Sequence, residues 1–117
     1  MQGWHAILDR DACRKEQRKD QGLSVTLINP FEVPAGKEAH FLTEWTAAAE
    51  LMRHEPGFLS SRLHQSLNPQ AKFRFVNVAR WESAQHFQTA MSKEAFQKAI
   101  GQMNYVVYPA LYKIIAD

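Results

Sequence analysis

The sequence contains a single cysteine, Cys13, which excludes an internal disulfide framework and a cysteine-based metal cage. Its five histidines show neither H-x-H nor H-E-x-x-H spacing, so no zinc site is predicted. No apolar run reaches the ~18 residues that a membrane helix requires, and the N-terminus lacks a signal-peptide core. These absences predict a cytoplasmic protein with no metal site and no membrane partner.

The sequence also lacks a large excess of charge of either sign. The net charge is +2 and the basic residues are scattered, which is not the pattern of a nucleic-acid binder. The sequence has no G-x-G-x-x-G, G-x-x-x-x-G-K-[ST] or G-x-S-x-G motif, so nothing indicates nucleotide binding or esterase chemistry. What it does have is 45% hydrophobic residues in 117, enough for one domain with a real core.

The first 22 residues differ from the rest of the chain. Dense charges of both signs run from Asp9 to Asp20, and Gly22 closes the segment. We interpret residues 1–22 as an N-terminal arm outside the core, or as a frayed or vector-derived leader. Residues 23–117 are expected to form the domain.

Hydrophobic periodicity in residues 23–117 alternates between strand and helix patterns. Strands are predicted at 23–33, 57–67, 72–81 and 105–115, a helix up to about residue 53, and a second helical region at 84–102. Ser83 is a plausible N-cap of that region, and Ser92 divides it into two pieces. Pro30 cannot donate a ladder hydrogen bond, which places it at a sheet edge or near a bulge. The order β-α-β-β-α-β predicts an α+β, ferredoxin-like fold with both helices on one face of an antiparallel sheet.

Two asparagines interrupt otherwise apolar strands. By alternation, Asn77 faces the helices together with Phe73, Phe75, Ala79 and Trp81. Strand 23–33 places Asn29 on the equivalent face, between Leu27 and Phe31. A buried amide without a partner costs about 1–3 kcal/mol. Either each asparagine bonds a loop or helix end, or the two amides and the indole of Trp81 face a small-molecule pocket, which is typically apolar with a few polar groups.

The opposite face of strand 72–81 carries Val76 and Val78 between charged residues. Something is expected to cover this face, and a second copy of the sheet is the simplest cover, so a homodimer through the sheet faces is predicted. His64 alternates with Phe58, Ser60 and Arg62, which places it toward the partner. It is a candidate general base or an interface hydrogen-bonding residue. The three tyrosines of strand 105–115 are expected to pack in the dimer.

Several short motifs occur together in this chain. They are N-P-F-x-V-P-x-G at 29–36, P-G-F at 56–58, R-L-H at 62–64, F-V-N-V-A-x-W-x-S at 75–83, Phe87, and F-x-K-A at 96–99. As a set, over roughly residues 23–115, the chain resembles the antibiotic biosynthesis monooxygenase family. The resemblance implies a dimeric α+β barrel, in which two ferredoxin-like sheets pack face to face.

The resemblance also implies a function. Asn77 and Trp81 match an active-site pair of members that oxidise polyketides without metal, flavin or haem. The implied activity is therefore a cofactor-independent monooxygenase acting on a small aromatic, quinol-like substrate. Candidate catalytic residues are Asn77, Trp81 and His64, and candidate substrate-binding residues are Asn29, Phe31, Phe75 and Phe87.

Two alternatives stay open. Haem-degrading relatives share an asparagine on the first strand and a tryptophan ending the third, as Asn29 and Trp81 do. In those relatives the iron ligand is a histidine, whereas this chain has Ile100 at that position, which argues against haem degradation. The second alternative is a non-catalytic ligand-binding or stress-response protein, because one fold hosts many functions and Asn29, Asn77 and Trp81 include no proton acceptor.

Overall fold

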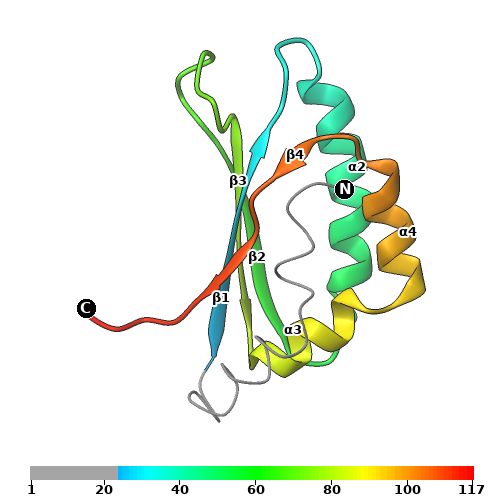
Figure 1. The fold of residues 1–117 in the computed structure, drawn as a ribbon, viewed down its shortest axis with the longest axis vertical. Coiled ribbons are helices and arrows are strands. Elements are labelled where there is room, and N and C mark those ends of the chain that lie inside the picture. The colour runs from blue at the N-terminus through cyan, green and yellow to red at the C-terminus, as the bar shows by residue number, and fades with distance from the viewer. Residues whose placement is uncertain (1–23) are drawn as a thin grey trace.

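The structure is a computed structural model that describes residues 24–117. Its elements are β1 (Val25–Glu32), α2 (Glu38–Met52), β2 (Phe58–Gln65), β3 (Phe75–Trp81), α3 (Ala84–Met91), α4 (Glu94–Gln102), β4 (Val106–Val107) and β5 (Ala110–Tyr112). The strands form one antiparallel sheet in the order β2-β3-β1-β4, with β5 also pairing with β1. All three helices lie on one side of the sheet (Figure 1). The predicted α+β fold is confirmed, and the expected arm, residues 1–22, lies outside the described residues.

The central strands β1 and β3 follow the predicted alternation. Odd-numbered residues from Val25 to Phe31 are buried against the helices, and those between them are half-buried. On β3 the buried set runs from Phe75 to Trp81 in the same way. The register places Asn29 directly opposite Asn77, so the two amides share one face of the sheet.

Strand β2 departs from strict alternation because its pairing with β3 is irregular between Phe58 and Ser60. A bulge of this kind inserts one residue and reverses the facing of those beyond it. Phe58, opposite Trp81, therefore lies on the helix side, whereas Ser60 and His64 lie on the other face. The expectation that Phe58 shares a face with Ser60, Arg62 and His64 is wrong for Phe58.

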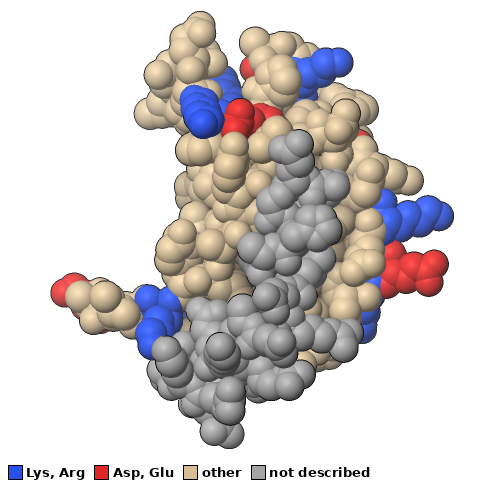
Figure 2. Space-filling model, viewed as in Figure 1, with Lys and Arg blue, Asp and Glu red and all other residues tan. Residues whose placement is uncertain are grey.

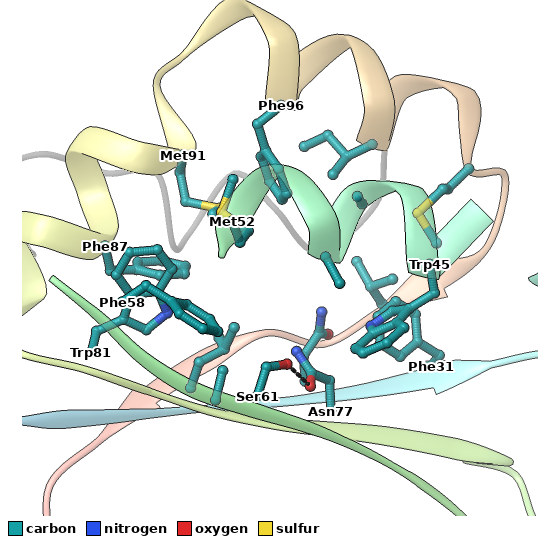
Figure 3. Close-up of a pocket in the computed structure, with 18 of the residues that line it drawn as sticks. Phe31, Trp45, Met52, Phe58, Ser61, Asn77, Trp81, Phe87, Met91 and Phe96 are labelled. Carbon is teal, nitrogen blue, oxygen red and sulfur yellow. Dashed lines mark hydrogen bonds between the residues drawn. The ribbon is translucent and has the colours of Figure 1, made fainter. Parts of the chain in front are cut away.

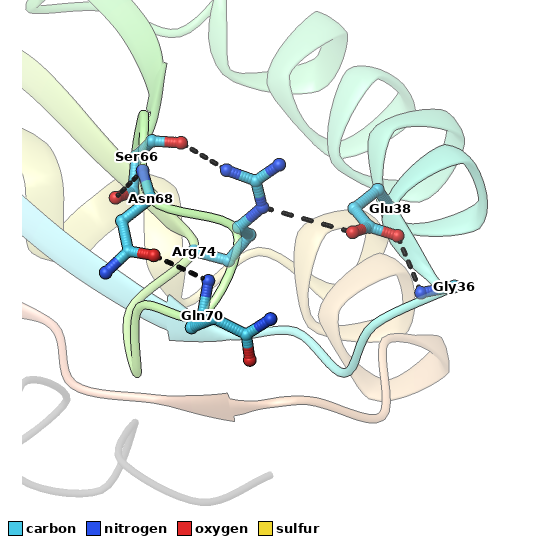
Figure 4. A network of polar contacts seen from close by, with 6 residues as sticks. All are labelled: Gly36, Glu38, Ser66, Asn68, Gln70 and Arg74. Atoms are coloured by element: carbon cyan, nitrogen blue, oxygen red, sulfur yellow. Dashed lines mark hydrogen bonds and ion pairs between the residues drawn. The ribbon is translucent and has the colours of Figure 1, made fainter.

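Strand β3 begins at Phe75, later than predicted, because the residues before it belong to a polar loop (Figure 4). Arg74 donates to the backbone oxygen of Ser66, and its Nε lies 3.9 Å from a carboxylate oxygen of Glu38 at the start of α2. This contact ties the β2–β3 hairpin to α2. Phe73 is consequently outside the strand and 37% exposed, rather than on the helix-facing side.

Pro30 lies in a central strand, at a break between two neighbours. The carbonyl of Pro30 accepts from the backbone N–H of Tyr108 (3.0 Å), between β4 and β5. The nitrogen and oxygen of one strand residue point to the same side, so the missing N–H faces this gap in the ladder. The predicted strand 105–115 is accordingly two short strands, interrupted around Pro109.

The helical predictions hold in detail. Ser83 caps α3, with its hydroxyl accepting from the backbone N–H of His86 (3.1 Å), and Ser92 separates α3 from α4. Helix α2 packs beside α4 over the sheet (Figure 1), and it buries Phe41, Ala48 and Met52. Ala84, Phe87, Ala90 and Met91 from α3 complete the core.

Within residues 24–117, no helix lies on one face of the sheet (Figure 1). We call it the uncovered face; it carries Ile28, Val76, Val78, Arg62 and His64. Charged side chains of both signs are scattered over the view in Figure 2 and do not form one patch. Among the described residues, no helix is long and apolar enough to cross a membrane.

Candidate functional site

A cavity of about 60 Å³ lies between the sheet and the helices (Figure 3). Its floor comes from β1, β2 and β3, and its roof from the helices. The lining residues are Leu27, Asn29, Phe31, Trp45, Ala48, Ala49, Met52, Phe58, Ser61, Asn77, Ala79, Trp81, Phe87, Met91, Phe96, Ile100, Met103, Tyr105 and Val107. Most are apolar and only a few carry polar groups, which is the composition of a small-molecule site.

Aromatic side chains close both ends of the cavity. At one end, the Trp81 ring meets Phe58 (5.4 Å between centroids) and Phe87 (5.6 Å) edge-on. Figure 3 shows Phe31 and Trp45 at the other end. Methionines from α2, α3 and the end of α4 lie along the roof, and their flexible thioethers can repack around a ring. This flexibility matters because typical ligand pockets measure roughly 300–1,000 Å³.

The polar groups gather at the middle of the floor. Asn29 is 2% exposed and Asn77 9%. The Ser61 hydroxyl donates to Oδ1 of Asn77 (2.9 Å). Among the described residues, Oδ1 of Asn29 is buried and has no hydrogen-bond partner. A buried acceptor without a partner costs free energy unless a ligand or water satisfies it.

The indole of Trp81 supplies a second unsatisfied group. The side chain is 1% exposed, and its Nε1 has no hydrogen-bond partner within the part of the chain that is described. A buried indole N–H usually finds an acceptor. The cavity therefore combines an indole donor at one end with an amide pair near the middle, and apolar walls surround both.

Tyr105 is the ionisable side chain on the wall. It packs edge-on against Phe41 (5.2 Å). Its pKa is raised above the ordinary value of 10.0 by burial, and further by the charge of Glu44 and a hydrogen bond to it. The phenol is therefore neutral at physiological pH and does not act as a base there. Tyr105 was expected to pack in the dimer, and its position on the cavity wall was not predicted.

The structure brings together most of the predicted site residues. Asn29, Phe31, Asn77, Trp81 and Phe87 all line the cavity. Phe75 lies behind it, stacked on Phe41 (4.7 Å), and contributes to the core rather than to the lining.

Neither His64 nor His86 lies in the cavity. His64 is exposed on the uncovered face, opposite Val76, and is not brought together with Asn77 and Trp81 in this chain. His86 lies at the start of α3, where its Nδ1 is 2.7 Å from the Ser83 hydroxyl. None of the described lining residues is a histidine or a carboxylate.

Sequence reasoning missed Ser61, Trp45 and the methionine roof. Alternation alone places Ser61 on the helix side, but the residue opposite it is Ala79. Its hydrogen bond runs diagonally to Asn77, two residues along β3, and no local motif marks such a contact. The sequence signal that could have revealed this contact is the presence of a polar residue, Ser61, on the helix-facing side of β2.

Residues 24–102, more than half of the chain, match the family described as antibiotic biosynthesis monooxygenase. The chain belongs to the antibiotic biosynthesis monooxygenase family. No curated protein matches it at a significant level. The predicted family is thereby confirmed.

Solved structures of this fold agree with that membership. A candidate monooxygenase from Shewanella loihica PV-4 is 39% identical, with a TM-score of 0.73, covering 81% of this chain and 97% of that one. SnoaB, a cofactor-independent oxygenase from Streptomyces nogalater, is 22% identical, with a TM-score of 0.71 and coverage of 80% and 95%. A heme-degrading protein from Mycobacterium tuberculosis is 24% identical, with a TM-score of 0.62 and coverage of 83% and 97%. Because the last two are under 25% identical, they show the fold alone.

The described lining of the cavity offers no histidine to a haem iron. Ile100, at the position where haem-degrading relatives are expected to place their histidine, lines the cavity and is 7% exposed. A hydrocarbon side chain cannot ligate iron.

Proposed function

We propose that the chain is a cofactor-independent monooxygenase that oxidises a small aromatic, quinol-type substrate with dioxygen. One observation carries the proposal. A buried, aromatic-walled cavity holds an indole N–H and an amide oxygen that have no partner among the described residues. Family membership supports the reaction class, and the apolar walls with their few polar groups favour a ring that bears oxygens.

The chemistry makes modest demands on the protein. A hydroquinone or anthrone loses a proton, and its anion gives one electron to dioxygen, which produces a substrate radical and superoxide. Recombination forms a carbon–oxygen bond, and protonation gives a hydroperoxide. Loss of water then leaves a carbonyl, so one oxygen atom enters the product and the other leaves as water. The substrate supplies all the electrons.

The protein would bind the substrate, lower the free-energy cost of ionising it and exclude water. The indole N–H of Trp81 and the amide of Asn77 are neutral donors that hydrogen-bond to substrate oxygens. Because the described lining contains no histidine or carboxylate, the reaction relies on a substrate acidic enough to ionise unaided. The proposal therefore assigns no general base to this chain, and His64 faces away from the cavity.

We also propose that two copies pair through the uncovered face. Ile28, Val76 and Val78 are half-buried there in a single chain, and a second sheet would remove their apolar surface from water. In such a pair, His64 lies at the interface between the copies.

The monooxygenase reaction is tested by measuring oxygen uptake by the purified protein. The assay contains a panel of hydroquinones and anthrones and no added cofactor. We expect uptake above the autoxidation blank. Asn77→Ala should lower kcat/KM by roughly 2- to 13-fold, since a hydrogen bond between neutral groups contributes about 0.5–1.5 kcal/mol. Asn68→Ala, which removes an amide from the exposed β2–β3 loop, is the matched control and should leave turnover unchanged.

The lack of a base in the cavity favours a second candidate, a small-ligand-binding protein without turnover. Absence of uptake with every substrate, in a folded protein that still binds aromatic ligands, would establish that alternative. Equal uptake by the wild type and Asn77→Ala would contradict the assigned site.

A further inference from the structure

The hydroxyl of Ser61 and the oxygen of Asn29 together set which way the Asn77 amide faces. A hydroxyl can also accept from an amide nitrogen, but turning the amide over would place its oxygen near the buried Oδ1 of Asn29 on the opposite strand, which already lacks a donor among the described residues. Ser61 donates its single proton to Oδ1 of Asn77 at 2.9 Å. Figure 3 shows the amide oxygen of Asn77 directed at Ser61 and the nitrogen directed toward the cavity. Asn77 is therefore held as a donor.

Asn29 complements this donor. It lies directly opposite Asn77 in the β1–β3 register, and cross-strand neighbours on one face have Cβ atoms about 5 Å apart. Its Oδ1 is buried without a partner among the described residues. The two asparagines thus present one acceptor and one donor side by side, and a hydroxyl satisfies both at once because it donates and accepts.

The indole of Trp81 presents a different polarity. It offers a donor only, four residues along β3 from Asn77, or roughly 13 Å between the two Cα atoms. Ala79 lies between them on the same face and is 3% exposed. Its small side chain leaves space above the sheet at this point, where the ring of a ligand would lie. An oxygen near Trp81 must accept, as a carbonyl or an oxyanion does.

We propose that Ser61 is a positioning residue that orients Asn77, and that the site binds a ring with a hydroxyl at the Asn29–Asn77 pair and an accepting oxygen toward Trp81. This inference rests on the proposed function for the identity of the substrate. It places the ionised oxygen of a quinol at Trp81, and the oxygen that keeps its proton at the asparagines. A ring whose hydroxyl is methylated cannot donate to Asn29.

Two probes that do not react with dioxygen test the inference by binding alone. 4-Hydroxybenzaldehyde carries the hydroxyl and an accepting carbonyl, and 4-methoxybenzaldehyde lacks the donor. Calorimetric titration at a pH where the phenol is neutral should show about tenfold tighter binding of the hydroxy probe to the wild type. Ser61→Ala should weaken the binding of both probes by roughly 2- to 13-fold, the contribution of one neutral hydrogen bond, because the Asn77 amide is then free to turn and no longer holds its donor toward the ring.

Three further variants separate positioning from a structural role. Ser61→Thr keeps the hydroxyl and should retain the wild-type affinity for both probes. Asn77→Asp still accepts from Ser61 but offers no donor to the ligand, and should weaken the binding of both probes. Ser60→Ala removes the neighbouring hydroxyl on the uncovered face and should change nothing.

Unchanged affinity of the folded Ser61→Ala protein for both probes would overturn the role of Ser61. Failure of the wild type to bind either probe, or to prefer the hydroxy probe, would overturn the ligand class. Neither result depends on turnover, so a negative outcome in the oxygen-uptake experiment is read separately.

Discussion

Each face of the sheet carries residues that depart from the usual distribution of polarity. The helix-covered face holds two buried amides, Asn29 and Asn77, among its aromatic residues, whereas the uncovered face holds Ile28, Val76 and Val78, which are half-buried. In an isolated domain, polar groups are expected outside and aliphatic groups inside. The two departures differ in kind: buried amides suit the polar ligand proposed above, and an aliphatic strip suits the proposed second copy.

The largest expected effect is on stability, and it comes from the covered face. Phe75 is 1% exposed and stacks on Phe41. Phe75→Ala should lower the free energy of unfolding by about 3–5 kcal/mol, because it removes a large buried ring and leaves a cavity. The matched change on the uncovered face, Val76→Ala, should cost less than about 1.5 kcal/mol. Urea unfolding at one fixed protein concentration measures both, and equal losses would contradict the contrast between the faces.

A second, smaller effect separates association from folding. Val78→Asp places a charge in the middle of the uncovered face, where burial against a second copy would be costly. The variant should remain folded by circular dichroism but sediment as a monomer, whereas we expect the wild type to sediment as the proposed dimer. Gln85→Asp, on the exposed surface of α3, is the control and should stay dimeric. A dimeric Val78→Asp protein would place the interface elsewhere.

The fold was predictable because its central strands obey one rule. The alternation on β1 and β3 survives intact, so the facing of Asn29, Asn77 and Trp81 follows from the sequence. The Ser83 cap and the break at Ser92 are local signals and were equally readable. These features depend on neighbours within a few residues of each other.

The parts that could not be predicted depend on contacts between distant segments. The bulge in β2 turns Phe58 into the cavity, and it exists only through pairing with β3. β3 begins only at Phe75, after the loop in which Arg74 contacts Glu38, so Phe73 lies outside it. Ser61 on β2 donates to Asn77 on the neighbouring strand β3. Nothing near any of these residues in the sequence specifies its partner.

The smallest effect compares a tyrosine of the cavity with one on the other face. The pKa of Tyr105 is raised by burial and by Glu44, so the folded state keeps this proton to a higher pH than the unfolded state does. The resulting stability is fully present below pH 10 and is lost as the pH rises through the folded pKa. Tyr105→Phe lacks this proton, so its unfolding free energy should fall less steeply above pH 10 than that of the wild type.

Thermal unfolding between pH 8 and 11 measures how steeply the unfolding free energy of each protein falls with pH. At pH 8, Tyr105→Phe should be less stable than the wild type by no more than about 0.5 kcal/mol, because solvent screens the contact with Glu44, and this gap should narrow as the pH rises. Tyr112→Phe, which pairs opposite Thr26 and is 51% exposed, should change the stability at pH 8 by less than Tyr105→Phe does. A constant gap for Tyr105→Phe would mean that its hydroxyl does not interact with Glu44 in the folded protein. The cavity wall would then lack the polar link to α2 that distinguishes it from the uncovered face.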